Sequence, residues 1–188
     1  MTQQLPLNML GFDVATQAEL ETEKTRITAT EAKGFVTMAA QATTSGTLKD
    51  FTGIAAGAKQ VAVIFAGVSL SGTANLRIQI GATTVPLTAG YAAGVSSGVG
   101  ASVSSAGFDQ DWGSATSVVH GTLLLTLVDA STNTWSAFGV FMSPTTGANP
   151  RFLSGTVALP GALGVVRVTT SNGTDTFDAG QCGVSYLV

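Results

Sequence analysis

From Gly34 to the C-terminus, the sequence is a succession of short runs rich in Val, Ile, Thr and Phe, separated by Gly, Ser, Asn and Asp. β-Branched and aromatic residues favour strands, and the separating residue types favour turns. In residues 76–80, Leu and Ile alternate with Arg and Gln, as expected for a strand with one buried face. The pattern predicts an all-β fold, an antiparallel β-sandwich that is jelly-roll-like.

The expected strands cover most of residues 34–188. They are Phe35–Ala42, Leu48–Thr52, Gln60–Val68, Asn75–Ile80, Val118–Val128, Thr134–Met142, Phe152–Ala158, Gly164–Thr170 and Cys182–Val188. Val61–Phe65 and Leu123–Leu127 are continuously apolar, which predicts central strands covered on both faces. Asp129–Asn133 and Asn172-Gly173 are typical of turns between strands. The uncharged stretch Ala89–Ala106 fits either a surface loop or an intersubunit strand.

Residues 1–33 differ in kind from the rest and form the first of two predicted regions, 1–33 and 34–188. They hold 8 of the 19 charged residues and every glutamate of the chain. Thr16 followed by Glu19 has the spacing of a capping box, which predicts a helix over Gln17–Arg26. Before it, an extended segment carries Leu5, Leu7, Leu10 and Phe12, which fits either a loose terminus or an anchor that binds another protein.

Charge is scarce over the whole chain. Only 10% of residues are Asp, Glu, Lys or Arg, against about 25% in ordinary soluble domains. A lone sandwich needs surface charge to resist association, so we expect neighbouring chains to cover part of this one, as a homo-oligomer or within a larger particle. No basic residue lies between Arg77 and Arg151, which disfavours nucleic-acid binding. The longest apolar run is too short for a membrane-spanning helix, so no membrane insertion is expected.

Catalytic chemistry has few candidates in this sequence. His120 is the single histidine and Cys182 the single cysteine, and both lie in strand-like runs, where they are expected to be structural or, for His120, a surface residue. Asp109 with Asp111, and Asp175 with Asp178, are explained better by turns than by calcium binding. We therefore expect no enzyme activity, no cofactor and no metal.

Aromatic residues are the candidates for contact with a surface ligand. Trp112, in a loop-like stretch between Asp111 and Gly113, and Tyr91 have rings that stack on sugars when exposed. Asp109 and Asp111 are the polar candidates beside them. Trp135 follows the predicted hairpin loop and is expected in the core instead.

Several phrases of the sequence resemble a module found in proteins of tailed bacteriophages and prophages. They are Phe51–Ile54, Val61–Ser69, Asp129–Trp135, Val166–Thr170 and Asn172–Gly180. The resemblance covers about residues 47–188 and implies a structural virion protein, a trimer, at a tail-fibre tip or spike. Such a protein is assembled in the cytoplasm of the bacterial host and contacts a glycan or receptor on the host surface. Only about 33 residues precede the module, which disfavours an independent long fibre.

These observations predict a virion protein in which residues 1–33 bind other virion proteins and the β-domain contacts the host. The alternatives are a capsid decoration protein of the head-fibre kind and a carbohydrate-binding module that uses Trp112 and Tyr91. A polysaccharide-degrading enzyme ranks below these three, because the sequence lacks a strong acid/base constellation.

Overall fold

The computed structural model describes residues 16–31, 34–96, 100–111, 113–145 and 150–188. The chain divides into two compact units, residues 1–34 and residues 35–188. The candidate anchor residues Leu5, Leu7, Leu10 and Phe12 lie outside the described residues, as does Trp112.

The first unit contains a single described helix, α1 (Gln17–Glu31). It begins with the predicted capping box: the Thr16 amide donates to the Glu19 carboxylate at 2.6 Å, and the Glu19 amide donates to the Thr16 hydroxyl at 3.3 Å. The side chains of residues 16–27 are exposed, so the described part of α1 buries no apolar face of its own. The helix is longer than the predicted Gln17–Arg26, because residues 27–31 include no Gly or Pro that would end it.

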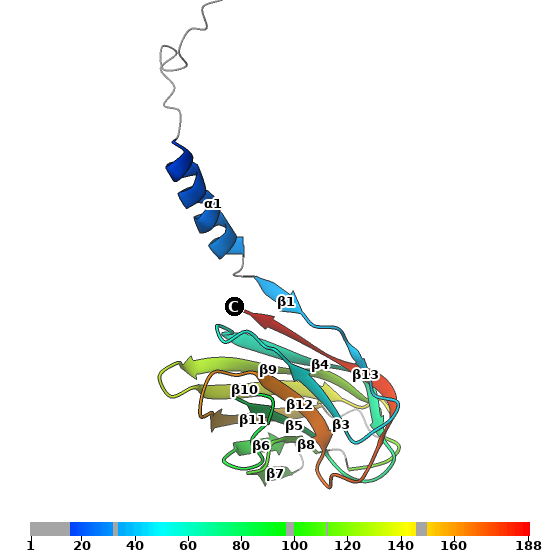
Figure 1. Cartoon of the computed structure of the whole chain (residues 1–188). Coiled ribbons are helices and arrows are strands. Elements are labelled where there is room, and N and C mark those ends of the chain that lie inside the picture. The colour runs from blue at the N-terminus through cyan, green and yellow to red at the C-terminus, as the bar shows by residue number, and fades with distance from the viewer. Residues whose placement is uncertain (1–15, 32–33, 97–99, 112, 146–149) are drawn as a thin grey trace, which may run out of the picture. The chain divides into compact units, whose positions relative to one another are not determined.

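The second unit is an antiparallel β-sandwich, which confirms the predicted fold class (Figure 1). The larger sheet has nine strands and the smaller sheet has four. In spatial order the larger sheet contains β1 (Phe35–Thr37), β13 (Phe177–Leu187), β4 (Gln60–Leu70), β9 (Val119–Asp129), β10 (Thr134–Met142), β11 (Arg151–Ala158), β6 (Ala92–Ser96) and β7 (Ala101–Ser104), and β2 (Gln41–Ala42) also pairs with β13. The smaller sheet contains β3 (Leu48–Thr52), β12 (Val165–Thr170), β5 (Leu76–Gly81) and β8 (Phe108–Gln110). The jelly-roll connectivity stays a prediction.

The core lies between the two sheets and is made of inward-pointing aliphatic and aromatic side chains. Trp135 is 1% exposed, as predicted, and Phe141 on the same strand is fully buried against Phe65, with ring centroids 5.8 Å apart. Cys182 is also buried, which confirms the expectation for that residue. In the smaller sheet, Ile78 and Ile80 of β5 pair with Val168 and Val166 of β12, and all four point inward.

Turns join the strands where the sequence predicts them. Asp129 ends β9, and its carboxylate accepts hydrogen bonds from the Ser131 amide and hydroxyl, while Asn133 adopts a positive φ of 49° just before β10. Between β12 and β13, the Asn172 side chain accepts from the amides of Thr174 and Asp175, and Gly173 has φ 72°. The first turn holds β9 and β10 in antiparallel register, whereas the second takes the chain from β12 of the smaller sheet to β13 of the larger sheet.

The structure corrects two predictions about strands and describes one stretch that the sequence left undecided. Residues 35–42 form two short strands, β1 and β2, instead of one. The undecided stretch 89–106 contains β6 and β7, and β8 follows it. Most important, β4 and β9 are covered on one face only, because Ile64 and Leu124 are exposed. A two-layer sandwich covers only the inner face of each sheet, so the second apolar face of these strands remains at the surface.

Candidate functional site

Two of the residues predicted as surface contacts, Tyr91 and Asp109, serve the fold instead. Tyr91 is 5% exposed: its hydroxyl accepts from the Ile80 amide at 2.8 Å, and its ring packs edge-on against Phe108 at 5.0 Å. Burial raises the pKa of this phenol to about 12, because the charged phenolate would lose its hydration there. Tyr91 is therefore not available to stack on a sugar, and the prediction that it is a surface contact is wrong.

Asp109 lies on β8 and is held by Arg77 of the neighbouring strand β5. Its two carboxylate oxygens accept from the Arg77 guanidinium at 2.6 and 2.7 Å, and the two side chains are only 13% and 17% exposed. Both oxygens are therefore occupied, which corrects the expectation of a free surface carboxylate. Asp111 is partly buried, and its carbonyl accepts from Arg151 at 3.1 Å. The role of the Asp111 side chain as a surface contact stays a prediction.

His120 and Cys182 are placed on opposite faces of the larger sheet. His120 is exposed on β9 and pairs with Ala66 of β4, whereas Cys182 points into the core from β13 and pairs with Phe65 of β4. Burial raises the pKa of the Cys182 thiol to about 11, so the reactive thiolate is scarce at neutral pH. Because a nucleophile and its base must share a hydrogen bond, these two residues form no catalytic pair.

The remaining aspartates form internal connections. Asp175 accepts from the Ala74 amide at 2.8 Å, and Asp178 accepts from the Ser69 hydroxyl. Hydrogen bonds from Asn172 and from the Ala74 amide lower the pKa of Asp175. No group of three or more His, Cys, Asp or Glu side chains that could hold a metal ion is found among the described residues.

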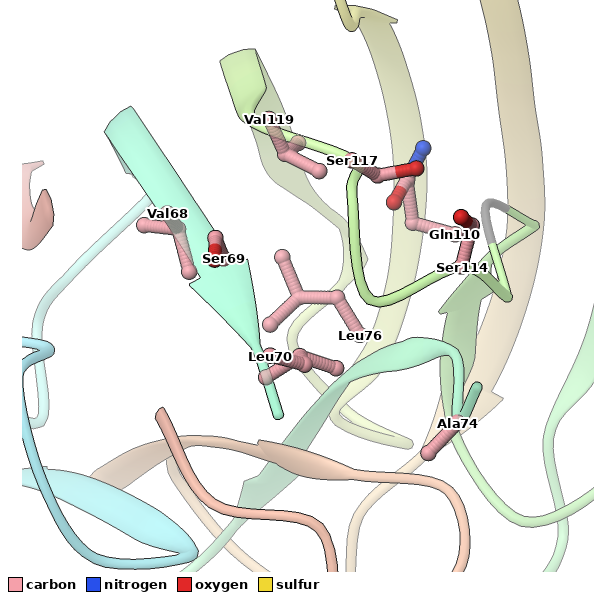
Figure 2. Close-up of a pocket in the computed structure, with 9 residues that line it drawn as sticks. All are labelled: Val68, Ser69, Leu70, Ala74, Leu76, Gln110, Ser114, Ser117 and Val119. Atoms are coloured by element: carbon pink, nitrogen blue, oxygen red, sulfur yellow. The ribbon is translucent and has the colours of Figure 1, made fainter. Parts of the chain in front are cut away.

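One enclosed pocket lies between the two sheets, close to Gln110 of β8 (Figure 2). Gln110 is fully buried, and neither polar atom of its amide has a hydrogen-bond partner in the part of the chain that the structure describes. The cavity has a volume of about 10 Å³, which is the size of one water molecule. It is too small for an organic ligand, so we do not assign it a functional role.

The feature that sequence reasoning missed is the outward-facing surface of the larger sheet, here called the outer face. It consists of the outward-pointing residues of β13, β4, β9, β10, β11 and β6. Its exposed large apolar side chains are Ile64, Leu124, Phe138, Val140, Met142 and Phe152, and Phe138 is 58% exposed. Isolated exposed apolar residues are ordinary on a protein surface, whereas a contiguous group marks an interaction site.

Strand register makes these side chains contiguous. One row across the sheet runs through Ala62 of β4, Leu124 of β9, Phe138 of β10 and Ser154 of β11. The adjacent row runs through Ile64, Thr122, Val140 and Phe152 on the same four strands. Directly paired residues within a row lie about 5 Å apart, and diagonal neighbours in adjacent rows lie about 7 to 8 Å apart, within reach of long and aromatic side chains.

The outer face also carries no ionised side chain at its centre. In the nine strands of the larger sheet, all within the described residues, the acidic and basic residues are Asp129, Arg151 and Asp178. Each lies at or next to the end of its strand. A third outward row runs beside these two, through Ala66 of β4, His120 of β9 and Met142 of β10. Within the three rows, His120 is the only titratable side chain.

Two glycines make hollows on the outer face. Beside Gly183 of β13 lies a hollow of about 260 Å³, lined by Met38, Ala40 and Ile64 among others, here called the β13 hollow. Beside Gly94 of β6 lies a second hollow of about 270 Å³, lined by Val103, Phe138 and Phe152 among others, here called the β6 hollow. The apolar side chains of β9 and β10 therefore stand between two depressions.

Comparison with known protein families, with curated proteins and with solved structures found no match to this chain. Within the described residues, no helix is both long enough and apolar enough to cross a membrane.

Proposed function

We propose that this chain is a structural, non-enzymatic subunit of a tailed-bacteriophage virion, a homo-oligomeric component of a tail tip, fibre or spike that contacts the host surface. The observation that carries the proposal is the outer face: a contiguous apolar surface, without charge at its centre, on a folded domain. A contiguous exposed apolar surface of this kind marks a site that another molecule covers. Subunits of larger assemblies have such surfaces by necessity.

The division of the chain into two units supports a role for residues 1–33 in attachment. The charges that a lone domain would spread over its surface are concentrated in this region, and the described side chains of α1 are exposed rather than packed against a core. Exposed Glu23–Arg26 and Glu21–Lys24 pairs within the helix contribute little stability. A helix of this composition gains stability mainly by binding a partner, for which other virion proteins are the proposed candidates.

The phrases behind the resemblance lie in strands and turns of the sandwich. Val61–Ser69 is most of β4, Asp129–Trp135 is the hairpin between β9 and β10, and Asn172–Gly180 is the turn that leads into β13. They carry no catalytic signature, and the virion context and the trimeric state are proposed from the resemblance of these phrases in sequence.

Of the alternatives, the capsid decoration protein uses the same features and differs only in where the particle binds residues 1–33. The carbohydrate-binding module loses one of its two aromatic residues, because Tyr91 is buried. We therefore rank it below both virion roles.

The test is to locate the protein on particles. Gold-labelled antibody against the β-domain, applied to purified virions and viewed by electron microscopy, is expected to label the distal tail. Label on the capsid would favour the decoration role. Particles without label, from a lysate in which the protein is free, would contradict a virion role altogether.

A further inference from the structure

We infer that the outer face is the surface through which copies of this chain bind one another, with Phe138 at the centre of the contact. This inference rests on the oligomeric part of the proposed function and adds to it the surface, the residues and the mode of packing.

The outer face is close in size to the surface that each partner buries in a stable interface. The outer face spans six neighbouring strands, β13 to β6, and strands in a sheet lie about 4.8 Å apart, so the face is roughly 30 Å wide with its side chains. Along β4, the outward residues Ala62 to Ala66 add about 14 Å, or roughly 20 Å with side chains. The projected area is on the order of 600 Å², close to the roughly 800 Å² that each partner buries in a stable interface.

The central rows of the outer face are uncharged. Two identical surfaces repel each other when each carries ionised groups of one sign, because every group then faces its own copy. The outer face has no acidic or basic side chain on its central rows, so two copies meet without repulsion and without stripping water from an ion. A charged partner, in contrast, would find no opposite charge there. This favours a second copy over a charged partner.

The outer face has both projecting side chains and a hollow. Phe138 and Phe152 stand out from the sheet, and the β13 hollow on the same face has the volume of a large apolar side chain. A phenyl ring from one copy fits into the β13 hollow of the next, where it contacts Met38 and Ile64. The projecting rings and the hollow are different parts of one face, so each copy offers both halves of the contact, whether two copies exchange it reciprocally or three copies close it around a ring.

The glycine at the floor of the hollow allows a test that leaves the subunit intact. A Cβ added at Gly183 would meet only the Ala40 Cβ, at 4.0 Å, so a side chain at this position is accommodated in the isolated domain. Gly183→Gln therefore fills the hollow without straining the strand. Phe138→Glu changes an exposed side chain, so it too is expected to fold normally.

Sedimentation velocity of the full chain, over a range of micromolar concentrations, measures the effect. We expect the wild-type chain to be an oligomer and Phe138→Glu to raise its dissociation constant at least about 30-fold, the loss typical of a central interface residue. Gly183→Gln is expected to raise it at least about 10-fold. The matched control is Val85→Glu, which adds the same charge at an exposed apolar residue of the loop after β5 and is expected to leave the oligomer unchanged. Circular dichroism confirms that each variant is folded.

The outcomes separate this inference from the proposed function. A wild-type chain that is oligomeric, with Phe138→Glu and Gly183→Gln equally oligomeric, would place the interface elsewhere and overturn the inference alone. A monomeric wild-type chain would overturn the inference and the oligomeric state together, while the labelling of virions would still test the virion role. If Leu7→Glu with Leu10→Glu dissociates the oligomer and Phe138→Glu does not, residues 1–15 hold the copies together and the inference is wrong.

Discussion

The two outward surfaces of the sandwich have opposite chemistry. Of the five charged residues on the strands of the smaller sheet, Asp50, Arg77, Asp109 and Arg167 lie on its outward face, whereas Lys49 pairs with the inward-pointing Val168. Four of them form two bidentate ion pairs, Arg167 with Asp50 and Arg77 with Asp109, each across neighbouring strands. The larger sheet has more than twice as many strands, with apolar residues at the centre of its outer face. The smaller sheet is thus built to face water, and the larger sheet is built to be covered.

The same contrast appears along the single strand β10. Phe141 points into the core and is fully buried, whereas Phe138 points outward and is exposed. The two residues have the same side chain, so a difference in what they contribute to the free energy of unfolding reflects the face of the sheet on which each one lies.

Phe141→Ala is expected to have the largest effect on the domain, a loss of about 3 to 5 kcal/mol in the free energy of unfolding, because it leaves a cavity against Phe65. Phe138→Ala is expected to cost less than about 1 kcal/mol in the dissociated subunit, since it removes little buried surface. Urea denaturation at a concentration where the chain is monomeric measures both. Equal losses for the two variants would show that the outer face is already covered within the subunit.

Arg77→Ala is expected to cost about 2 to 3 kcal/mol, because it leaves the mostly buried Asp109 carboxylate without its partner. The double variant Arg77→Ala with Asp109→Ala is expected to recover part of this loss, since the unpaired charge is then gone. Urea denaturation of both variants is the measurement. A loss below about 0.5 kcal/mol for the single variant would mean that this ion pair contributes only as an exposed pair does.

Tyr91 predicts a loss of stability at alkaline pH. Its pKa is about 12 in the folded domain and about 10 in an unfolded chain, so between these values the unfolded state releases the proton first and stability falls as pH rises. The full effect is roughly 2 kcal/mol by pH 12. Tyr91→Phe is expected to have a lower stability at neutral pH, through loss of the bond to Ile80, and a smaller decrease between pH 10 and pH 12. Identical alkaline slopes in both proteins would contradict this assignment.

Arg167→Ala is expected to cost about 1 kcal/mol, less than Arg77→Ala, because its pair with Asp50 is more exposed, at 26% for each side chain. Thermal unfolding at low and high salt measures it, and salt is expected to reduce the difference from wild type. A loss of stability as large as that of Arg77→Ala would mean that the exposure of an ion pair does not determine how much it stabilises this domain.

Much of the sandwich was predictable from local patterns. The alternation in residues 76–80 and 166–170 correctly indicates which side chains point inward, because a strand turns successive side chains to opposite faces whatever it packs against. The hairpin at Asp129–Asn133 and the turn at Asn172-Gly173 were predictable for the same reason, since turn residues act through their own backbone.

Other elements could not be recognised in this way. β6 and β7 consist of Ala, Gly, Ser and Val, whose small side chains give no clear alternation between polar and apolar positions. Tyr91 gives no local sign of burial, because its partners Ile80 and Phe108 are 11 and 17 positions away and meet it only across the fold. The candidate site as a whole was missed, because its residues come from six strands that register brings together.

The sequence alone determined that this chain is an antiparallel β-sandwich preceded by a charged helix, because strand, turn and capping preferences act between residues close in the chain. Only the tertiary structure decided that one face of β4 and β9 lies at the surface. A continuously apolar strand has the same sequence whether both of its faces are covered or only one is. Which of these applies depends on how many layers the fold contains, and this fold has two.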